Sequence, residues 1–586
     1  MNGSEYIAEF LHRRGVRRVH CMIGGANAFM IDAIARHAHL SYVCHQHEQS
    51  AAMAVDAVWR TKREMGVAMA TSGPGAVNLL SGIACCYFDS TPGFYITGQV
   101  NLKESAGYRD AQVRQRGFQD TRVVAMATPI TQYAVQITEP AELIHALPHA
   151  WGVALSGRMG PVLLDVPMNV QKEPMPDHAP FLEPEPAQPL APAAGMAATR
   201  HAVQDFFHAG QRPLVLFGAG VGLAGAEDAL VHWLRTHDIP FVASWNGMTC
   251  FDHDLPNYCG GIGVYGNRGA NTILQNCDRL WVLGSRLDNR QRGGDTRQFV
   301  PGGRIHVIDV DGEELKKYGE SRYESTQMDL SLLPALLEGL TPPGGDPAWR
   351  TYCRQLKNRY FGQEIVVPAR QAKGMSPYAV VKRLQACVAA NAIVIGDTGA
   401  TVCWLFQMFH RRQHCLFTAG GHSPMGYALP AAIGAALENP DRQVIAISGD
   451  GGFQLNIQEL QTVRHLQLPV SLVIFNNGGY GIIKQFQDSY FEGRHEASGT
   501  GYSCPDFARI ADAYGLAYQR ITHLDALTPD SFAHHGGGII DIILDPHTPI
   551  EPKLEMGRPL NDQFPYMDEA EFQAINPFVH FDRGGD

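Results

Sequence analysis

Short runs of consecutive apolar residues recur along this chain and alternate with stretches of helical period. Such runs occupy residues 213–217, 280–283, 305–308, 392–395, 444–447, 472–475 and 539–544. Strands that are apolar at nearly every position are typical of parallel sheets covered by helices on both faces. The pattern predicts an α/β fold of three doubly wound parallel-sheet domains in series.

Two breaks in this pattern suggest domain boundaries. Residues 171–199 contain seven prolines without an apolar period, and a second Pro/Gly-rich stretch covers residues 341–347. Such segments are typical of extended linkers. We therefore expect a first domain at 1–170, a linker at 171–199, a middle domain at 200–341, a linker at 342–371, a third domain at 372–550 and a tail at 551–586. The tail, rich in proline and acidic residues, could be disordered or could fold over a site as a lid.

Composition narrows the class of partner. The chain has 586 residues and a formal net charge of −11, and its basic residues form only short clusters such as 13–18. This argues against nucleic acid and against acidic membrane surfaces. No signal peptide and no apolar run near ~20 residues is present, and the twelve cysteines show no C-x-x-C spacing. We expect a cytoplasmic protein that acts on a small molecule.

The most specific motif lies at the ends of two neighbouring predicted strands. Gly449-Asp450-Gly451 follows one strand, and Asn476-Asn477 closes the next, 26 residues beyond Asp450. Ligands bind at this edge of open parallel sheets. Carboxylate and amide oxygens suit Mg²⁺, and glycine amides can approach phosphate. A lone GDG is usually only a turn, but this combination favours a magnesium-diphosphate site.

The motif resembles the thiamine diphosphate signature, and nearly the whole chain resembles the acetolactate synthase family. The resemblance implies that the metal ligands are Asp450, Asn477 and the carbonyl of Gly479. It also implies that Glu48, in His47-Glu48-Gln49, faces the aminopyrimidine of the cofactor. A carboxyl there promotes the imino form that removes the thiazolium proton. Taken alone, Glu48 would be an ordinary first-turn glutamate that favours the helix dipole.

Further loops match the family in the same order along the chain. They are residues 71–76 with Asn78, 97–100, 397–401 and 420–426, in which Met425 would be the apolar wedge that bends the cofactor. Taken separately, these are strand-to-helix turns and a core methionine. The resemblance implies cofactor contacts at Gly25, Gly75, Asn78, Ala400, Thr401, Ser423, Met425, Gly449, Gly451, Gly452, Gly479, Tyr480, Gly481 and Ile482.

The middle segment resembles the FAD-binding domain of the same family. A Gly-rich turn alone is weak evidence for a dinucleotide, since relatives keep this fold without flavin. The resemblance implies a non-redox FAD held by Gly218, Ala219, Gly220, Ser244, Gly263, Arg286, Asp288, Arg290 and Asp309.

Substrate contacts also follow from the resemblance, with departures from it. Residues 118–120 resemble the family's F-Q-E element, so Gln119 joins Glu48 as a catalytic residue, although Asp120 replaces the glutamate. Arg290 would contact the second substrate, or could form a surface salt bridge. Gln132 stands where relatives have lysine. The expected substrate residues are Phe118, Gln119, Arg290, Ile482 and Phe486, of which Ile482 and Phe486 replace a methionine and a tryptophan.

The resemblance implies an enzyme that decarboxylates a 2-oxo acid, with pyruvate as the best candidate, and transfers the two-carbon unit to a second carbonyl. A keto-sugar or other ketone acceptor and simple decarboxylation remain open. A non-catalytic relative is disfavoured by the joint presence of Glu48, Asp450 and Asn477. An NAD enzyme is disfavoured because no strand precedes a full G-x-G-x-x-G with a downstream acid. A homodimer or homotetramer with active sites between subunits is also implied.

Overall fold

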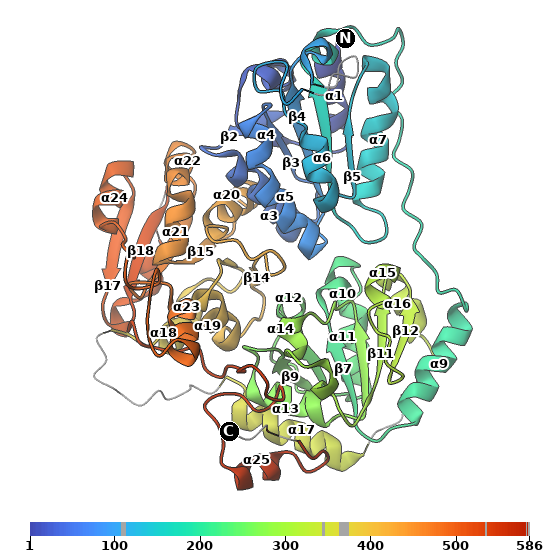
Figure 1. Cartoon of the computed structure of the whole chain (residues 1–586), viewed down its shortest axis with the longest axis vertical. Helices are drawn as coiled ribbons and strands as arrows, with labels where there is room; N and C mark the ends of the chain where they lie inside the picture. The colour runs from blue at the N-terminus through green and yellow to red at the C-terminus, as the bar shows by residue number, and fades with distance from the viewer. Residues whose placement is uncertain (107–112, 343–345, 363–373, 534–535, 582, 584–586) are drawn as a thin grey trace.

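Three parallel sheets of six strands each form the molecule in the computed structural model (Figure 1). The structure describes residues 1–106, 113–342, 346–362, 374–533, 536–581 and 583. Helices cover both faces of each sheet, which confirms the predicted architecture of three doubly wound domains. Within the described residues, no helix is both long enough and apolar enough to cross a bilayer.

The first domain has a sheet whose central strands are completely buried. Its strand order is β2 (Ser41–Cys44), β1 (Arg18–Cys21), β3 (Val67–Ala70), β4 (Gly93–Gln99), β6 (Pro161–Pro167) and β5 (Tyr133–Gln136). Every residue of β3, β4 and β6 is buried, as expected for a sheet enclosed between helices. The principal helices are α1 (Gly3–Arg13), α2 (Ala28–Arg36), α3 (Glu48–Lys62), α5 (Leu80–Asp89) and α7 (Leu143–Ala154).

The third domain repeats the topology of the first. Its order is β14 (Cys415–Phe417), β13 (Ile393–Gly396), β15 (Val444–Gly449), β16 (Val470–Asn476), β18 (Gly538–Ile543) and β17 (Ala517–Ile521). The helices that matter for the site are α19 (Ala400–Met408), α20 (Ala428–Glu438), α21 (Asp450–Phe453), the 3-10 helix η8 (Gln454–Glu459) and α23 (Gly481–Tyr490). Gly449 pairs with Phe475, so β15 and β16 end side by side.

The middle domain has a different strand order. It runs β12 (Tyr323–Gln327), β11 (Arg304–Asp309), β10 (Arg279–Leu283), β7 (Pro213–Phe217), β8 (Phe241–Ala243) and β9 (Tyr258–Gly261). Counted from β7 as strand 1, this is the order 3-2-1-4-5-6 of dinucleotide-binding folds, with its switch point between β7 and β10. Helix α10 (Ala219–Leu223) follows β7 in the chain, and helix α14 (Asn289–Arg292) follows β10. These are the two strands on either side of the switch point.

Small residues let the first domain pack closely against the third. Helices α3 and α20 lie between the two sheets in Figure 1. Ala51, Ala52 and Ala54 of α3 are fully buried, and a Cβ on Gly434 of α20 would lie 2.4 Å from the carbonyl oxygen of Ala54. The backbones therefore approach so closely that any larger side chain at Gly434 would force the helices apart.

The second expected linker contains a helix. Residues 347–360 form α17 (Pro347–Tyr360), and Trp349, Cys353 and Leu356 are buried against the middle domain. Their spacing of four and three residues is a helical apolar stripe, which the Pro/Gly-rich start of the segment obscured. Residues 363–371 of that expected linker lie outside the described residues. The first expected linker differs, because residues 173–195 form an extended segment along one side of the molecule (Figure 1).

The tail packs on the middle domain through residue 581. Leu554, Leu560 and Ile575 are buried in the middle-domain core, and α25 (Glu569–Ile575) ends where Tyr352 Oη donates to the Ile575 carbonyl at 2.6 Å. Residues 551–581 are therefore packed on the folded chain in this structure. The tail is acidic and proline-rich on average, and its few buried apolar residues are too widely spaced to form a periodic pattern.

Candidate cofactor and active site

Asp450 lies at the carboxyl end of β15 with almost no exposure to solvent. Its side chain is 1% exposed; Oδ1 accepts from Gly451 N and Oδ2 from Gly479 N, both at 3.1 Å. Burial raises the pKa of this carboxyl to about 6, despite these hydrogen bonds. A buried carboxylate that is short of positive charge is suited to receive a cation.

Two further oxygens converge on the Asp450 carboxylate. The Asn477 amide oxygen lies 2.8 Å from the Gly479 carbonyl oxygen and 3.3 Å from Asp450 Oδ1, and only a reversed amide would hydrogen-bond both. No cluster of three or more His, Cys, Asp or Glu side chains that could hold a metal occurs among the described residues. The donor set here is instead one carboxylate, one amide and one carbonyl, all hard oxygens that fit Mg²⁺.

The starts of α19, α21 and α23 surround these oxygens. A Cβ on Gly451 would lie 2.3 Å from the Tyr480 ring, and one on Gly481 would lie 3.5 Å from Ala400 Cβ. A Cβ on Gly449 would lie 3.2 Å from Thr401 Oγ1, and the Cβ of Gly399 would lie 3.7 Å from Ile482 Cγ2. The expected diphosphate residues are therefore brought together at helix N-termini, where backbone N–H groups favour phosphate.

Asp397 anchors the loop that carries Met425. It is 2% exposed and accepts from Gly426 N at 3.0 Å, Ala428 N at 3.2 Å and Ser448 Oγ at 3.1 Å. A Cβ on Gly452 would lie 3.1 Å from its Oδ1. Burial raises the pKa of Asp397 to about 6. Sequence reasoning assigned this segment to the diphosphate and missed its role as a loop anchor, because the partners lie 29 to 51 residues away.

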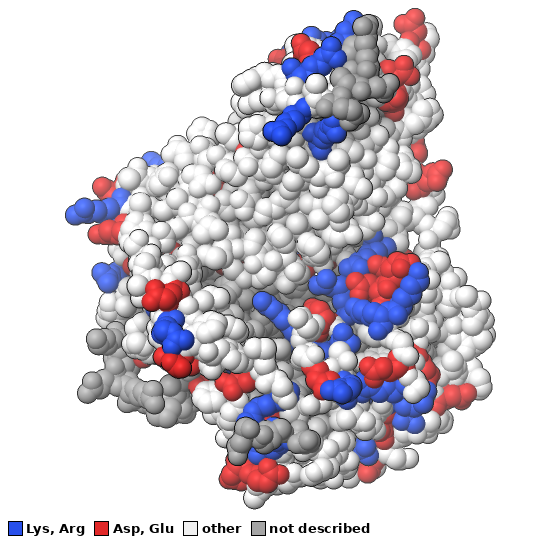
Figure 2. All heavy atoms as spheres, viewed as in Figure 1, with Lys and Arg blue, Asp and Glu red and all other residues white. Residues whose placement is uncertain are grey.

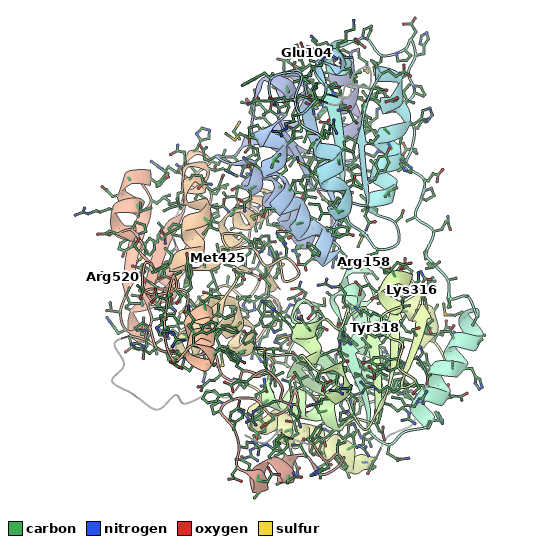
Figure 3. All side chains as sticks on the ribbon, in the orientation of Figure 1. Glu104, Arg158, Lys316, Tyr318, Met425 and Arg520 are labelled. Carbon is green, nitrogen blue, oxygen red and sulfur yellow. The ribbon has the colours of Figure 1, made fainter. Side chains whose placement is uncertain are left out.

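The same loop is fixed at a second point and lies near the centre of the molecule. Ser423, whose φ is +57°, lies with its Oγ 2.5 Å from Thr398 Oγ1. Figure 3 shows Met425 near the middle of the molecule, in the third domain. The loop is thus held at both ends around Met425.

Glu48 begins α3 and is 7% exposed. Asn78 Nδ2 donates to its Oε2 at 3.0 Å, and a Cβ on Gly75 would lie 3.1 Å from Oε1. Oε1 has no hydrogen-bond partner in the described part of the chain, so it stays available to a ligand. Gly75 keeps the approach to this oxygen open.

Gln119 and Gly25 lie close to the same loop. Gln119 has φ +64°, and a Cβ on Gly73 would lie 2.8 Å from its Cβ. A Cβ on Gly24 would lie 2.6 Å from Thr71 Cβ, whereas a Cβ on Gly25 would meet no described atom within 4 Å. The first-domain residues expected at the aminopyrimidine therefore gather around the 71–78 segment.

Two of the expected substrate residues are uncovered in a single chain. Phe118 is 86% exposed and Phe486 is 39% exposed, and Ile482 is half-buried. Phe118 and Phe486 therefore form exposed apolar surface on the single chain. Neither this surface nor Glu48 lines the cavity of the middle domain.

A cavity of about 390 Å³ lies at the switch point of the middle sheet. Eight of the nine expected FAD residues line it: Ala219, Gly220, Ser244, Gly263, Arg286, Asp288, Arg290 and Asp309. Gly218 lies behind them, because its Cβ would be 2.1 Å from the Gly284 carbonyl oxygen. Burial raises the pKa of Asp309. The site also involves first-domain residues that sequence reasoning missed, among them Phe88 and Arg158.

Arg158 closes this cavity across the domain boundary. Its Nη1 contacts Asp311 at 2.8 Å and Glu314 at 3.1 Å, beside α15 (Gly312–Leu315). Figure 3 labels Arg158 at the boundary of the first and middle domains, and Figure 2 shows basic and acidic side chains gathered on the surface there. The first and middle domains therefore share one wall of the cavity.

Comparison with known proteins gives matches along most of the chain. Thiamine pyrophosphate enzyme domains match the chain in order: the N-terminal TPP binding domain at residues 1–126, the central domain at 201–328 and the C-terminal TPP binding domain at 397–541. The chain is 33% identical to the Escherichia coli acetolactate synthase isozyme 2 large subunit, covering 90% of this chain and 92% of that protein.

Two further similarities extend along nearly the whole length. A probable acetolactate synthase large subunit of Methanocaldococcus jannaschii is 32% identical, with 93% and 92% covered. The fold matches a thiamine diphosphate-dependent 4-hydroxybenzoylformate decarboxylase of Rhodococcus jostii RHA1 with a TM-score of 0.79 at 20% identity, over 93% of this chain and 99% of that one. This chain therefore belongs to the thiamine pyrophosphate enzyme family and is similar to its acetolactate synthase large subunits.

Proposed function

We propose that the protein is a thiamine-diphosphate- and Mg²⁺-dependent carboligase that decarboxylates pyruvate and adds the two-carbon unit to a second carbonyl compound. The observation that carries the proposal is the convergence of the Asp450, Asn477 and Gly479 oxygens at the strand edge of a family member that keeps Glu48. The acetolactate synthase titles of the relatives support pyruvate as the donor.

Asp450, Asn477 and the Gly479 carbonyl would hold the Mg²⁺, and the N-termini of α19, α21 and α23 would hold the diphosphate. Bound thiamine diphosphate supplies the electron sink that lets a 2-oxo acid lose carbon dioxide. The chain supplies Met425 as an apolar surface beside the cofactor, held by the Asp397 hydrogen bonds to its loop.

Glu48 is the proton-handling residue in this proposal. Asn78 orients the carboxyl through Oε2, and Oε1 is left to hold or donate a proton to an aminopyrimidine nitrogen. Burial excludes water from the carboxyl, so a hydrogen bond at Oε1 would be stronger than one in solvent. Gln119 would contact the bound substrate from the neighbouring loop.

We also propose that FAD occupies the middle-domain cavity in a non-redox role. The cavity volume falls in the range of about 300–1,000 Å³ of ligand pockets, and the strand order favours a dinucleotide. Asp309 offers a carboxylate to ribose hydroxyls, and Arg286 offers a cation to a pyrophosphate.

Departures from the family pattern at Gln132, Ile482 and Phe486 support a keto-sugar or another ketone as a second candidate acceptor. Gln132, in place of a lysine, uses its Nε2 to donate to the Arg158 carbonyl at 3.0 Å. Arg290 forms no ion pair within the described residues and so remains available to an acceptor's carboxylate or hydroxyl.

A homodimer or homotetramer completes the proposal. The exposed Phe118 and Phe486 would be covered by a second subunit. Figure 2 supports this, because the surface over α5 and α20 carries few charged side chains. Uncharged surfaces of this kind favour association.

The test is product analysis with purified protein, thiamine diphosphate, Mg²⁺, FAD and pyruvate. Acetolactate formed from pyruvate alone supports the synthase reaction. Carbon dioxide release that requires an added ketone or keto sugar supports the second acceptor class, and acetaldehyde alone indicates a decarboxylase. No carbon dioxide release would refute pyruvate as the donor. The Asp450→Ala protein serves as the control that must be inactive.

A further inference from the structure

A buried hydrogen-bonded series of side chains joins the third domain to the start of α3. His20 Nδ1 lies 3.0 Å from His45 Nε2, and His45 Nδ1 lies 3.1 Å from Glu459 Oε2. The exposed fractions of His20, His45 and Glu459 are 1%, 3% and 0%. His20 and His45 belong to the first domain and Glu459 is the last residue of η8, so the series crosses the domain boundary.

Glu459 accepts hydrogen bonds at both carboxylate oxygens. Oε1 accepts from the backbone N–H groups of Gln46 at 2.9 Å and His47 at 3.1 Å, and Oε2 accepts from Thr462 Oγ1 at 2.8 Å as well as from His45. Burial by itself would raise the pKa of Glu459, but these hydrogen bonds outweigh it and lower the pKa below its usual value. The carboxyl is therefore ionised near neutral pH.

The ionised carboxylate fixes the first donor of the series. A carboxylate can only accept, so His45 Nδ1 carries a hydrogen, and the other ring nitrogen of His45, Nε2, faces His20 Nδ1. Burial, with His45 and Arg18 nearby, holds the pKa of His20 well below its usual range, so His20 is neutral. Its Nε2 is buried with no hydrogen-bond partner among the described residues, so the series ends at His20.

The backbone that Glu459 holds leads directly into Glu48. Gln46 and His47 are the two residues before it, and His47 also caps α3 by accepting from Gln49 N at 3.1 Å. A second residue of η8, Asn456, accepts from Ser50 Oγ at 3.1 Å and donates to the Gly426 carbonyl at 2.7 Å, next to Met425. One short segment of the third domain thus contacts both the first turn of α3 and the Met425 loop.

We propose that Glu459, oriented by His45, is a positioning residue that fixes the turn from which Glu48 projects. The inference rests on the proposed role of Glu48 and deepens it, because it identifies what holds that carboxyl in register with the aminopyrimidine. Displacements of about 1 Å in a reacting group can cost up to about 100-fold in rate, so loosening this turn should slow proton transfer without removing the group that performs it.

The experiment measures exchange of the thiazolium C2 proton of bound thiamine diphosphate with solvent deuterium, in the Mg²⁺-loaded protein. Glu459→Gln should slow exchange about tenfold, because a neutral acceptor binds the two backbone N–H groups about half as strongly. The affinity for thiamine diphosphate should change little, because the hydrogen bonds of Glu459 go to His45, Gln46, His47 and Thr462 and not to the proposed metal ligands. His45→Leu should also slow exchange, whereas His45→Asn, whose Nδ2 can replace the Nδ1 donor, should retain most of the rate.

Glu438→Gln is the matched control. Glu438 forms an ion pair with Arg18 between the same two domains but lies at the far end of α20 from the Glu48 turn. Exchange that is normal in Glu459→Gln, or equally slow in Glu438→Gln, would overturn the positioning role. Equal rates in His45→Asn and His45→Leu would do the same, and this pair decides the question should Glu459→Gln fold poorly.

Glu48→Gln, measured in parallel, separates the two levels of the argument. Slow exchange in Glu48→Gln with normal exchange in Glu459→Gln would reject the positioning role alone. Normal exchange in Glu48→Gln would reject the proposed role of Glu48 and the inference built on it.

Discussion

Replacing Glu48 by glutamine turns one carboxylate oxygen into an amide nitrogen and leaves the other side-chain atoms in place. Asn78 Nδ2 donates to Glu48 Oε2 at 3.0 Å, so the amide oxygen of a glutamine must take that position to avoid two opposed donors. The amide nitrogen then occupies the position of Oε1, beside Gly75. It can still donate a hydrogen bond to a ring nitrogen, but it cannot transfer its proton.

The size of the effect follows from this geometry. Because the side chain keeps its volume and its bond to Asn78, thiamine diphosphate affinity should change little. Loss of the proton-transferring group should lower the turnover rate by about 10²- to 10³-fold, within the range of general acid–base catalysis. This corresponds to about 3–4 kcal/mol of transition-state stabilisation.

Steady-state turnover, cofactor affinity by equilibrium dialysis and thermal stability together test this expectation. Glu5→Gln is the matched control, since Glu5 is also a first-turn helix glutamate, which accepts from Asn2 N at 3.0 Å in α1. If Glu48 were only a favourable charge at a helix start, both variants would show a small loss of stability and full activity. Turnover within threefold of the wild type in Glu48→Gln would refute the assignment.

Four further variants test other parts of the structure. Asp450→Asn should abolish Mg²⁺-dependent binding of thiamine diphosphate, measured by dialysis with and without the metal. Asp309→Asn should weaken FAD about 10- to 100-fold in a flavin fluorescence titration, the value of a charged hydrogen bond. Trp349→Ala should cost about 3–5 kcal/mol of stability, seen as a lower Tm, because this ring of α17 is fully buried. Burial raises the pKa of Asp165 to about 6, so its contribution to stability is greatest below about pH 4 and falls as the pH rises through 6; the Tm of Asp165→Asn relative to wild type should therefore rise from pH 4 to 6 and then level off.

Much of the site could be predicted because its signals are local in the sequence. The GDG segment and the Asn-Asn pair each follow an apolar strand, and parallel strands end at a common edge. That rule alone predicts that Asp450 and Asn477 lie together, and in the structure the Asn477 amide lies 3.3 Å from Asp450 Oδ1. The resemblance to a known family added Glu48, which no local pattern distinguishes from other first-turn glutamates.

Other features left no local signal. The composition of the tail left disorder and a lid both open, whereas Leu554 and Ile575 are buried on a domain nearly 300 residues earlier in the chain. Asp397 reads as part of a phosphate loop, and only the folded chain places it under the Gly426 backbone. Composition describes the average of a segment, whereas burial depends on which few side chains meet a partner surface.

The sequence by itself determined the three α/β domains, the strand edges that carry ligand chemistry and the family, because periodicity and short motifs are properties of neighbouring residues. Only the tertiary structure decided which distant side chains contact the residues of the site. Glu459 is 414 residues from His45, and their hydrogen bond exists only because α3 and η8 pack across a domain boundary. A buried carboxylate needs donors wherever the fold can supply them, and the chain order does not state where those donors lie.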